Sequence, residues 1–192
     1  MRLPYVSNPP PTATPEDAAI VARIRARRAP RLLQSLDLAL LHSPPVADGW
    51  NSFLDAIRTK TSLGADIREI AICRVAVCNK AWYEWDHHAP LASEAGVSSA
   101  GLEVVKRLVL EGLDGPEELD DRQWAALLYA DEMTRSVQVQ HQTFELLHRH
   151  FNHQEVVEIT ATVAAYNCVS RFLVALDVGE RNGLGPDQAP GK

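Results

Sequence analysis

The sequence predicts an all-α protein built from about eight or nine helices. Three observations carry this prediction. No convincing run alternates apolar and polar residues, as a half-buried strand would. Helix-start signals recur along the chain, as at Thr14 before a proline and at Asn152 before the last long apolar stretch. Prolines cluster before residue 46, and from there to Pro186 only Pro90 and Pro116 occur, which leaves room for long helices.

Three parts are expected along the chain: a proline-rich arm at residues 1–15, a single helical domain at 16–179 and a flexible tail at 180–192. Within the domain, apolar periodicity predicts helices at 15–28, 30–42, from 49 onward, 66–88, from 98 onward, from 120 onward, 141–151 and 153–178. We expect Pro44 and Pro45 to end the second of these helices, and Pro90 to break or kink the helix that precedes it. A loop is expected between residues 112 and 120.

The composition is that of an ordinary globular protein. Hydrophobic residues make up 46% of the 192 positions and charged residues 23%, and the formal net charge is −6. The one basic run, Arg23-Ile24-Arg25-Ala26-Arg27-Arg28, falls in a helical pattern and is expected to be a solvated face. Nucleic acid is therefore not an expected partner.

The sequence also predicts a cytoplasmic protein without a membrane span. The N-terminus has no apolar segment of the signal-peptide type, and no run of about 18 apolar residues occurs. The three cysteines, Cys73, Cys78 and Cys168, lie in apolar helical segments. An odd number of cysteines in such positions indicates reduced thiols in the core.

The densest group of functional side chains lies at residues 82–88. On a helix, Glu84 and His88 lie one turn apart on one face, and the same face projects back to Ala81, Val77 and Cys73. Because those three residues are small or apolar, we expect the acid and the imidazole to extend a buried stripe. A carboxylate and an imidazole in such a wall form a plausible general acid/base pair. The alternative is a structural ion pair on a helix surface, since pairs of this spacing are common.

Three segments resemble the carboxymuconolactone decarboxylase family of the alkylhydroperoxidase-like superfamily. They are Glu69 with the run Tyr83-Glu84-Trp85-Asp86-His87-His88-Ala89-Pro90, the run Asp121-Arg122-Gln123-Trp124-Ala125-Ala126 with its continuation to Thr134, and the stretch from His150 through Glu158 to Tyr166 and Phe172. The resemblance covers roughly residues 50–178. It implies an alkylhydroperoxidase-like helical bundle, obligate homo-oligomers that are often trimers or hexamers, and, in the decarboxylase branch, chemistry without a metal or organic cofactor.

The superfamily has a peroxidase branch and a decarboxylase branch. In the peroxidase branch a glutamate precedes a Cys-x-x-Cys-x-x-x-His motif, and Glu69 and His88 match the ends of that pattern in spacing. However, Ala81 and Glu84 stand where the two cysteines would be, so the redox pair is missing. The decarboxylase branch shows Glu-x-x-x-His at this place, and Glu84 and His88 match it.

These observations predict Glu69, Glu84 and His88 as catalytic residues, with His88 delivering a proton and Glu84 or Glu69 orienting its ring. Candidate substrate-binding residues are the aromatic and histidine neighbours and two arginines suited to a carboxylate, namely Tyr83, Trp85, His87, Arg74 and Arg171. Purely structural roles stay open as alternatives. Glu69 would then pair with Arg68 or Arg74, the aromatic residues would lie in the core or an interface, and His87 would be exposed. No metal site is predicted, because neither the histidines at 148–153 nor Asp86 with His88 complete a ligand set.

The favoured function is a cofactor-free decarboxylase acting on a small lactone or keto acid. A hydrolase or isomerase using the same residues, a thiol peroxidase and a non-catalytic oligomeric binding protein are the alternatives. The expected partners are a small-molecule substrate and further copies of the chain.

Overall fold

The computed structural model describes residues 1–110, 115–186 and 188, and every regular element in them is a helix. The nine helices are α1 (Pro15–Arg28), α2 (Ser35–Leu40), α3 (Pro44–Thr59), α4 (Ala65–Asn79), α5 (Trp82–Glu94), α6 (Ser99–Lys106), α7 (Asp121–Ser136), α8 (His141–His150) and α9 (His153–Leu176). The all-α prediction is confirmed. The expected starts at Thr14, Asp120 and Asn152 are N-caps whose side chains accept a backbone N–H three residues on.

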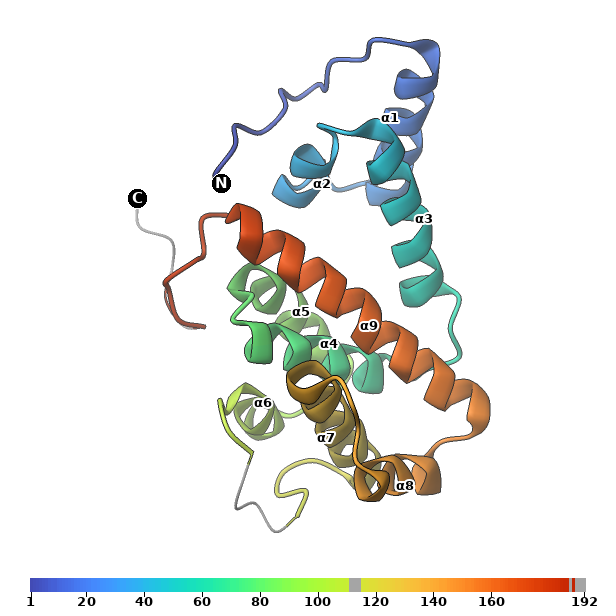
Figure 1. Cartoon of the computed structure of the whole chain (residues 1–192), viewed down its shortest axis with the longest axis vertical. Helices are drawn as coiled ribbons and strands as arrows, with labels where there is room; N and C mark the ends of the chain where they lie inside the picture. The colour runs from blue at the N-terminus through green and yellow to red at the C-terminus, as the bar shows by residue number, and fades with distance from the viewer. Residues whose placement is uncertain (111–114, 187, 189–192) are drawn as a thin grey trace.

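Helix α4 lies at the centre of the fold and packs against α5, α7 and α9 (Figure 1). It is apolar nearly all round, as expected of a helix with neighbours on every side. Ile72 and Val75 belong to a larger apolar cluster shared with α1, α3 and α9, whereas Ile70 and Cys73 belong to a smaller one shared with α5, α6 and α7. The central helix therefore holds two cores together.

The first three helices form a cap over one end of this body. Figure 1 shows α1, α2 and α3 grouped on one side of the long helix α9. The N-terminal arm runs back to the end of α9, where the backbone N–H of Arg2 donates to the carbonyl of Leu176 at 2.8 Å. Because α1 packs on α3, and α3 packs on α9, the cap is positioned directly above one face of α9.

The stretch at 66–88 is two helices, where the sequence predicts one. Helix α4 ends at Lys80, which adopts the left-handed conformation (φ 54°), and α5 begins two residues later. The N–H groups of Lys80 and Ala81 return to the carbonyls of Val77 and Ala76, so the end of α4 satisfies its own carbonyls. The turn folds α5 back onto α4, and Glu69 is thereby brought beside α5.

The proline predictions hold only in part: α2 does end before Pro44, at Leu40, but α5 is not broken at Pro90. Pro44 opens α3 where it was expected to end the preceding helix, because a proline in the first helical turn gives up no hydrogen bond. Pro90 lies inside α5, which continues to Glu94. Pro90 and Asp86 are exposed, so the Asp86 carbonyl that the proline leaves unpaired faces solvent. The second helix is also shorter than predicted, since α2 starts only at Ser35.

Of the helices in the described ranges, α9 is long and apolar enough to cross a membrane by length and composition, and 44% of its most apolar window is buried. It packs against α3, α4, α5, α7 and α8. A helix with these contacts is also typical of the core of a soluble protein. The cytoplasmic location stays a prediction, as does the division into arm, domain and tail.

Candidate active site

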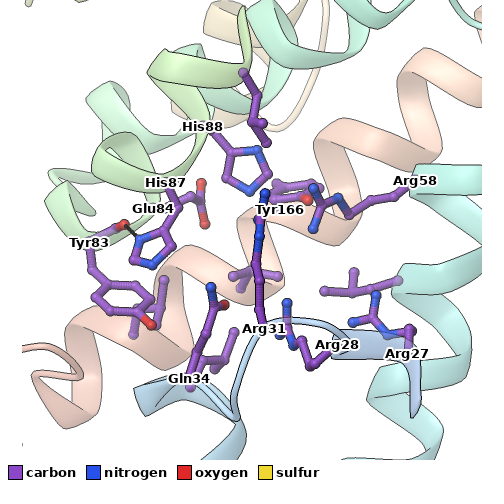
Figure 2. A pocket seen from close by; sticks show the side chains of 15 residues that line it. Arg27, Arg28, Arg31, Gln34, Arg58, Tyr83, Glu84, His87, His88 and Tyr166 are labelled. Carbon is purple, nitrogen blue, oxygen red and sulfur yellow. Dashed lines mark hydrogen bonds between the residues drawn. The ribbon is translucent and has the colours of Figure 1, made fainter. Parts of the chain in front are cut away.

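A cavity of about 60 Å³ lies between the N-terminal cap and the helices α5 and α9 (Figure 2). A water molecule needs about 10–15 Å³ by the same measure, so the space suits a small organic molecule. Its lining is Arg27, Arg28, Arg31, Gln34, Leu36, Leu54, Arg58, Tyr83, Glu84, His87, His88, Leu91, Tyr166, Val169 and Leu173. Four arginines, one glutamate, two histidines and two tyrosines therefore line the same cavity, together with Gln34 and five aliphatic side chains.

His88 is held by Glu69 from the neighbouring helix. Nδ1 of His88 lies 2.6 Å from Oε2 of Glu69, and both side chains are buried. Burial lowers the pKa of His88 despite the carboxylate beside it, and the hydrogen bond from His88 keeps the pKa of Glu69 below its ordinary value although burial opposes this. The pair is thus a neutral imidazole donating Nδ1–H to a carboxylate, which leaves Nε2 as an acceptor for the cavity.

Glu84 lies one turn before His88 on α5 but makes no hydrogen bond to it. Its Oε1 accepts a hydrogen bond of 2.9 Å from Ser170 Oγ on α9, and its Oε2 is buried without a partner among the described residues. Burial raises the pKa of Glu84 well above the ordinary value of 4.5. Burial without a charged partner therefore favours the protonated form of Glu84, whereas the hydrogen bond from His88 favours the ionised form of Glu69.

Tyr166 on α9 forms part of the cavity wall and was not among the predicted site residues. Its ring meets the His88 ring edge-on, with centroids 5.0 Å apart, and the residue is 2% exposed. No hydrogen bond joins its hydroxyl to another residue in the described ranges. In the sequence, Tyr166 stood out only as a residue of an apolar helix that belongs to one of the segments resembling the family.

Four arginines line the cavity, and all come from the cap. Arg28 is paired with Asp37 at 2.8 Å, and Arg27 donates to the amide oxygen of Asn51. The guanidinium groups of Arg31 and Arg58 make no hydrogen bond or ion pair with another described residue. Burial lowers the pKa of Arg27, and the neighbouring charges of Arg28 and Arg58 lower it further, as expected where positive charge is in excess.

The expectation of a solvated basic face at residues 23–28 is therefore only partly right. Arg23 and Arg25 are exposed, but Arg27 and Arg28 turn inward and the side chain of Arg28 is 13% exposed. Arg23 and Arg27 lie one turn apart on one face of α1 and both contact α3, through Asp48 and Asn51, so helix periodicity alone does not separate the exposed arginines from the inward ones. The sequence does not tell which face meets α3 and α9, because that is decided by contacts far along the chain.

Two of the five predicted substrate-binding residues line the cavity. Tyr83 does so half-buried, and His87 does so with its Nδ1 at 2.8 Å from the Tyr83 carbonyl. Trp85 is instead buried in the smaller apolar cluster, as the core alternative proposed.

The two predicted arginines lie elsewhere, which corrects their assignment to the cavity. Arg74 is fully buried, and its guanidinium donates to Asp131 and to the carbonyls of Val105 and Arg107. Arg171 is exposed and donates to Asn167. Arg74 is committed to internal contacts because a fully buried guanidinium has to be paired and hydrogen-bonded.

The cysteines take no part in the cavity. Cys168 is exposed on α9, so the expectation of three core thiols is wrong for this residue. Burial raises the pKa of Cys73 well above its ordinary value and that of Cys78 to about 12. Thiols of this kind are poor nucleophiles at neutral pH. In the described ranges, no group of three or more histidine, cysteine or acidic side chains is arranged to hold a metal ion.

Residues 44–132 match the model of the carboxymuconolactone decarboxylase family. Among curated proteins, no sequence matches this chain. The matched segment contains Glu69, Glu84, His88 and Arg58, whereas Arg27, Arg31 and Tyr166 lie outside it.

Several solved structures share the fold. The alkylhydroperoxidase AhpD core of an uncharacterized peroxidase-related protein from Ralstonia eutropha JMP134 has a TM-score of 0.75 and 21% identity, over 99% of this chain and 97% of that one. A peroxidase-related protein from Silicibacter sp. TM1040 has a TM-score of 0.69 and 17% identity, over 94% and 95%. The debrominase Bmp8 in complex with 2,3,4-tribromopyrrole has a TM-score of 0.68 and 16% identity, over 86% and 87%.

These likenesses confirm the alkylhydroperoxidase-like fold. Ala81 and Glu84 stand where the peroxidase motif has its two cysteines, and of these two residues Glu84 lines the cavity. Residues 44–132 thus match the carboxymuconolactone decarboxylase family within a helical fold that is shared with the AhpD-like structures, and the Cys-x-x-Cys pair is missing.

Proposed function

We propose that this protein is a decarboxylase that needs no cofactor and acts on a small lactone or keto acid through Glu84, His88 and Glu69. One observation carries the proposal. A neutral carboxylic acid at Glu84 and a carboxylate-oriented imidazole at His88 line one small cavity, opposite a set of arginines. Pairs of titratable groups whose environments push their pKa values apart are typical of acid/base sites.

The arginines support an acidic substrate. Arg31 and Arg58 have no anionic partner among the described residues, and Arg27 contacts only a neutral amide. A guanidinium forms a planar fork that matches a carboxylate. The excess positive charge would be balanced when a substrate carboxylate enters, which favours organic acids over neutral compounds of the same size.

The chemistry needs a carbonyl conjugated to the carbon that bears the leaving carboxylate. The bond from that carbon to the carboxylate breaks, CO₂ departs, and the electron pair moves onto the carbonyl oxygen as an enolate. A proton is then added to carbon as the enolate returns to a carbonyl. The net change is the uptake of one proton and the release of one CO₂, with no oxidant or reductant.

Glu84 is the residue suited to give this proton. Burial in the cavity wall raises its pKa and favours the protonated form, which makes a proton available for transfer to carbon. After transfer, the buried carboxylate of Glu84 is unstable and takes a proton again. His88 can relay that proton from solvent through Nε2, because Glu69 fixes its tautomer by holding Nδ1–H.

A hydrolase or isomerase on the same scaffold is the second candidate, because the same acid and base could move a proton between two carbons or activate water. The separating observation is chemical: a decarboxylase releases CO₂, and the other two do not.

The test is a panel of small carboxylated lactones and 3-keto acids, incubated with the purified protein while CO₂ and substrate loss are both followed. We expect stoichiometric CO₂ release from at least one compound. Replacement of Glu84 by Gln or His88 by Ala should lower the rate by about 10²–10⁴-fold.

His148→Ala is the matched control for His88, because His148 is exposed on α8 and lies outside the cavity. Substrate loss without CO₂ would favour the hydrolase or isomerase. Equal rates in wild type and in both site variants would contradict an acid/base role for these residues.

A further inference from the structure

We propose that Tyr166 and Arg58 form an oxyanion subsite, which holds the substrate's carbonyl oxygen and stabilises the enolate left when CO₂ departs. The inference rests on the proposed function for the identity of the oxyanion, but the subsite itself is argued from the cavity wall. Neither residue was predicted as part of the site, and Tyr166 lies outside the segment matched by the family model.

The hydroxyl of Tyr166 is an unused hydrogen-bond donor at the cavity. The residue is 2% exposed and lines the cavity, and its hydroxyl has no partner among the described residues. Its oxygen is not among the fully buried polar atoms that lack a partner, so it keeps some accessible surface, and the hydroxyl of a largely buried tyrosine usually finds a hydrogen-bond partner. By contrast, the hydroxyl of Tyr129, which is also buried, is 2.9 Å from Thr160 Oγ1. The missing partner of Tyr166 is therefore expected to be a molecule in the cavity.

Tyr166 is suited to donate and not to accept a proton. Burial raises the pKa of its hydroxyl, and the nearby carboxyl groups of Glu69 and Glu84 act in the same direction, while Arg58 opposes them. The phenol thus stays neutral over the working pH range. A neutral O–H held in a wall of low dielectric stabilises a developing negative charge strongly, because it needs no reorganisation during the reaction.

Arg58 adds a charge at the same place. It reaches the cavity from α3, and Figure 2 shows its guanidinium and the ring of Tyr166 directed into the same space as His88. Its positive charge lowers the pKa of Glu69, His88 and Tyr166, so it would also favour a negative charge on a bound oxygen. Its guanidinium has no carboxylate of its own among the described residues, so it is free to pair with an oxyanion.

The subsite completes the electron balance of the proposed reaction. As the bond to the leaving carboxylate breaks, its electron pair moves through the conjugated system to the carbonyl oxygen. That oxygen accepts hydrogen bonds from Tyr166 and Arg58 while it is negatively charged. When Glu84 delivers its proton to carbon, the pair returns and the carbonyl is restored, so neither Tyr166 nor Arg58 changes its protonation state.

The probe for this subsite is 3-nitropropanoate, which carries a carboxylate and ionises beside its nitro group to a nitronate, an enolate-like oxyanion. The nitronate is protonated slowly, so both forms can be mixed rapidly with the protein at one pH and their binding compared. We expect wild type to bind the nitronate at least about 10-fold more tightly than the nitro form. Tyr166→Phe should remove about 10- to 100-fold of nitronate affinity, the usual effect of a lost hydrogen bond to a charged group, and leave the nitro form nearly unchanged.

Tyr129→Phe is the matched control, because it removes a buried hydroxyl that is already paired with Thr160 away from the cavity. Equal nitronate affinity in Tyr166→Phe and wild type overturns the inference, as does an equal loss in both tyrosine variants. The assay needs no turnover, so it is independent of the CO₂ assay. A nitronate preference lost in Tyr166→Phe without CO₂ release from any acid supports the subsite and contradicts the decarboxylase.

Discussion

Nδ1 of His88 lies 2.6 Å from Oε2 of Glu69, although 19 positions separate the two residues in the chain. They come from different helices, α5 and α4, which fold back on each other at Lys80. Glu84 is one turn from His88 and makes no hydrogen bond to it. The carboxylate that orients the imidazole is therefore Glu69, and Glu84 is left as a separate, neutral acid.

The pairing of His88 with Glu69 predicts how much turnover falls when each residue is replaced alone and when both are replaced together. Replacing His88 by Ala should lower turnover by about 10²–10⁴-fold. Glu69→Gln should lower it by a smaller factor, because the imidazole remains but its tautomer is no longer held. The double variant should be little slower than His88→Ala alone, since members of one unit are not additive. Rate constants of all four proteins check this, and fully additive losses would contradict a coupled pair.

Glu84 and Glu69 should affect stability in opposite directions. The unfolded chain ionises Glu84 near pH 4.5, whereas the folded chain keeps it protonated to higher pH, so the free energy of unfolding falls as pH rises through that window. Glu84→Gln removes this pH-dependent loss of stability and should raise the melting temperature at pH 8 by about 3 °C or more. The gain over wild type should become smaller toward pH 5.

Glu69→Gln is the matched control for this experiment. The pKa of Glu69 is lowered in the fold, so its carboxylate stabilises the folded state above the unfolded pKa and this contribution is lost as pH falls. We expect Glu69→Gln to melt below wild type at pH 8. Thermal melts across pH 5–8 check both; a lower melting temperature for Glu84→Gln throughout would contradict the buried neutral acid.

The arginines of the cap should control substrate affinity. Arg31→Ala should raise KM for an acidic substrate by about 10-fold or more, because it removes a charged hydrogen-bond donor. The value of kcat should change less. Arg25→Ala is the control, since Arg25 is exposed and lies outside the cavity. Equal KM values for the two variants would show that the excess charge of the cavity does not bind substrate.

The protein should show no thiol peroxidase activity. The Cys-x-x-Cys pair is missing, and burial makes Cys73 and Cys78 poor nucleophiles. A hydroperoxide consumption assay on wild type and on serine variants at both positions checks this. Hydroperoxide turnover that disappears in either variant would revive the peroxidase alternative.

A homo-oligomer, with a trimer or hexamer favoured by the family resemblance, stays a prediction. Trp82, Trp85 and Trp124 are buried inside a single copy and leave little apolar surface for assembly. The apolar surface that remains includes Phe144 and Val157, which are 39% and 67% exposed beside one surface hollow. Light scattering should give a mass well above 21.2 kDa. A monomer at micromolar concentration would contradict this.

Local features of the chain were sufficient to determine the helical class and several helix starts. Capping side chains at Thr14, Asp120 and Asn152 act within three residues of their own positions, so the sequence alone places them. The one-turn spacing of Glu84 and His88 is equally local, and both residues do line the cavity.

Only the tertiary structure decided the charges and partners of the site. Glu69 and Glu84 are the same residue type, and the sequence does not tell that the hydrogen bond from His88 keeps one ionised while burial keeps the other neutral. Arg31 and Tyr166 come from opposite ends of the chain and meet at one cavity because α3 carries the cap onto α9. Burial and charge proximity depend on contacts between distant segments, and neither is encoded in helix periodicity.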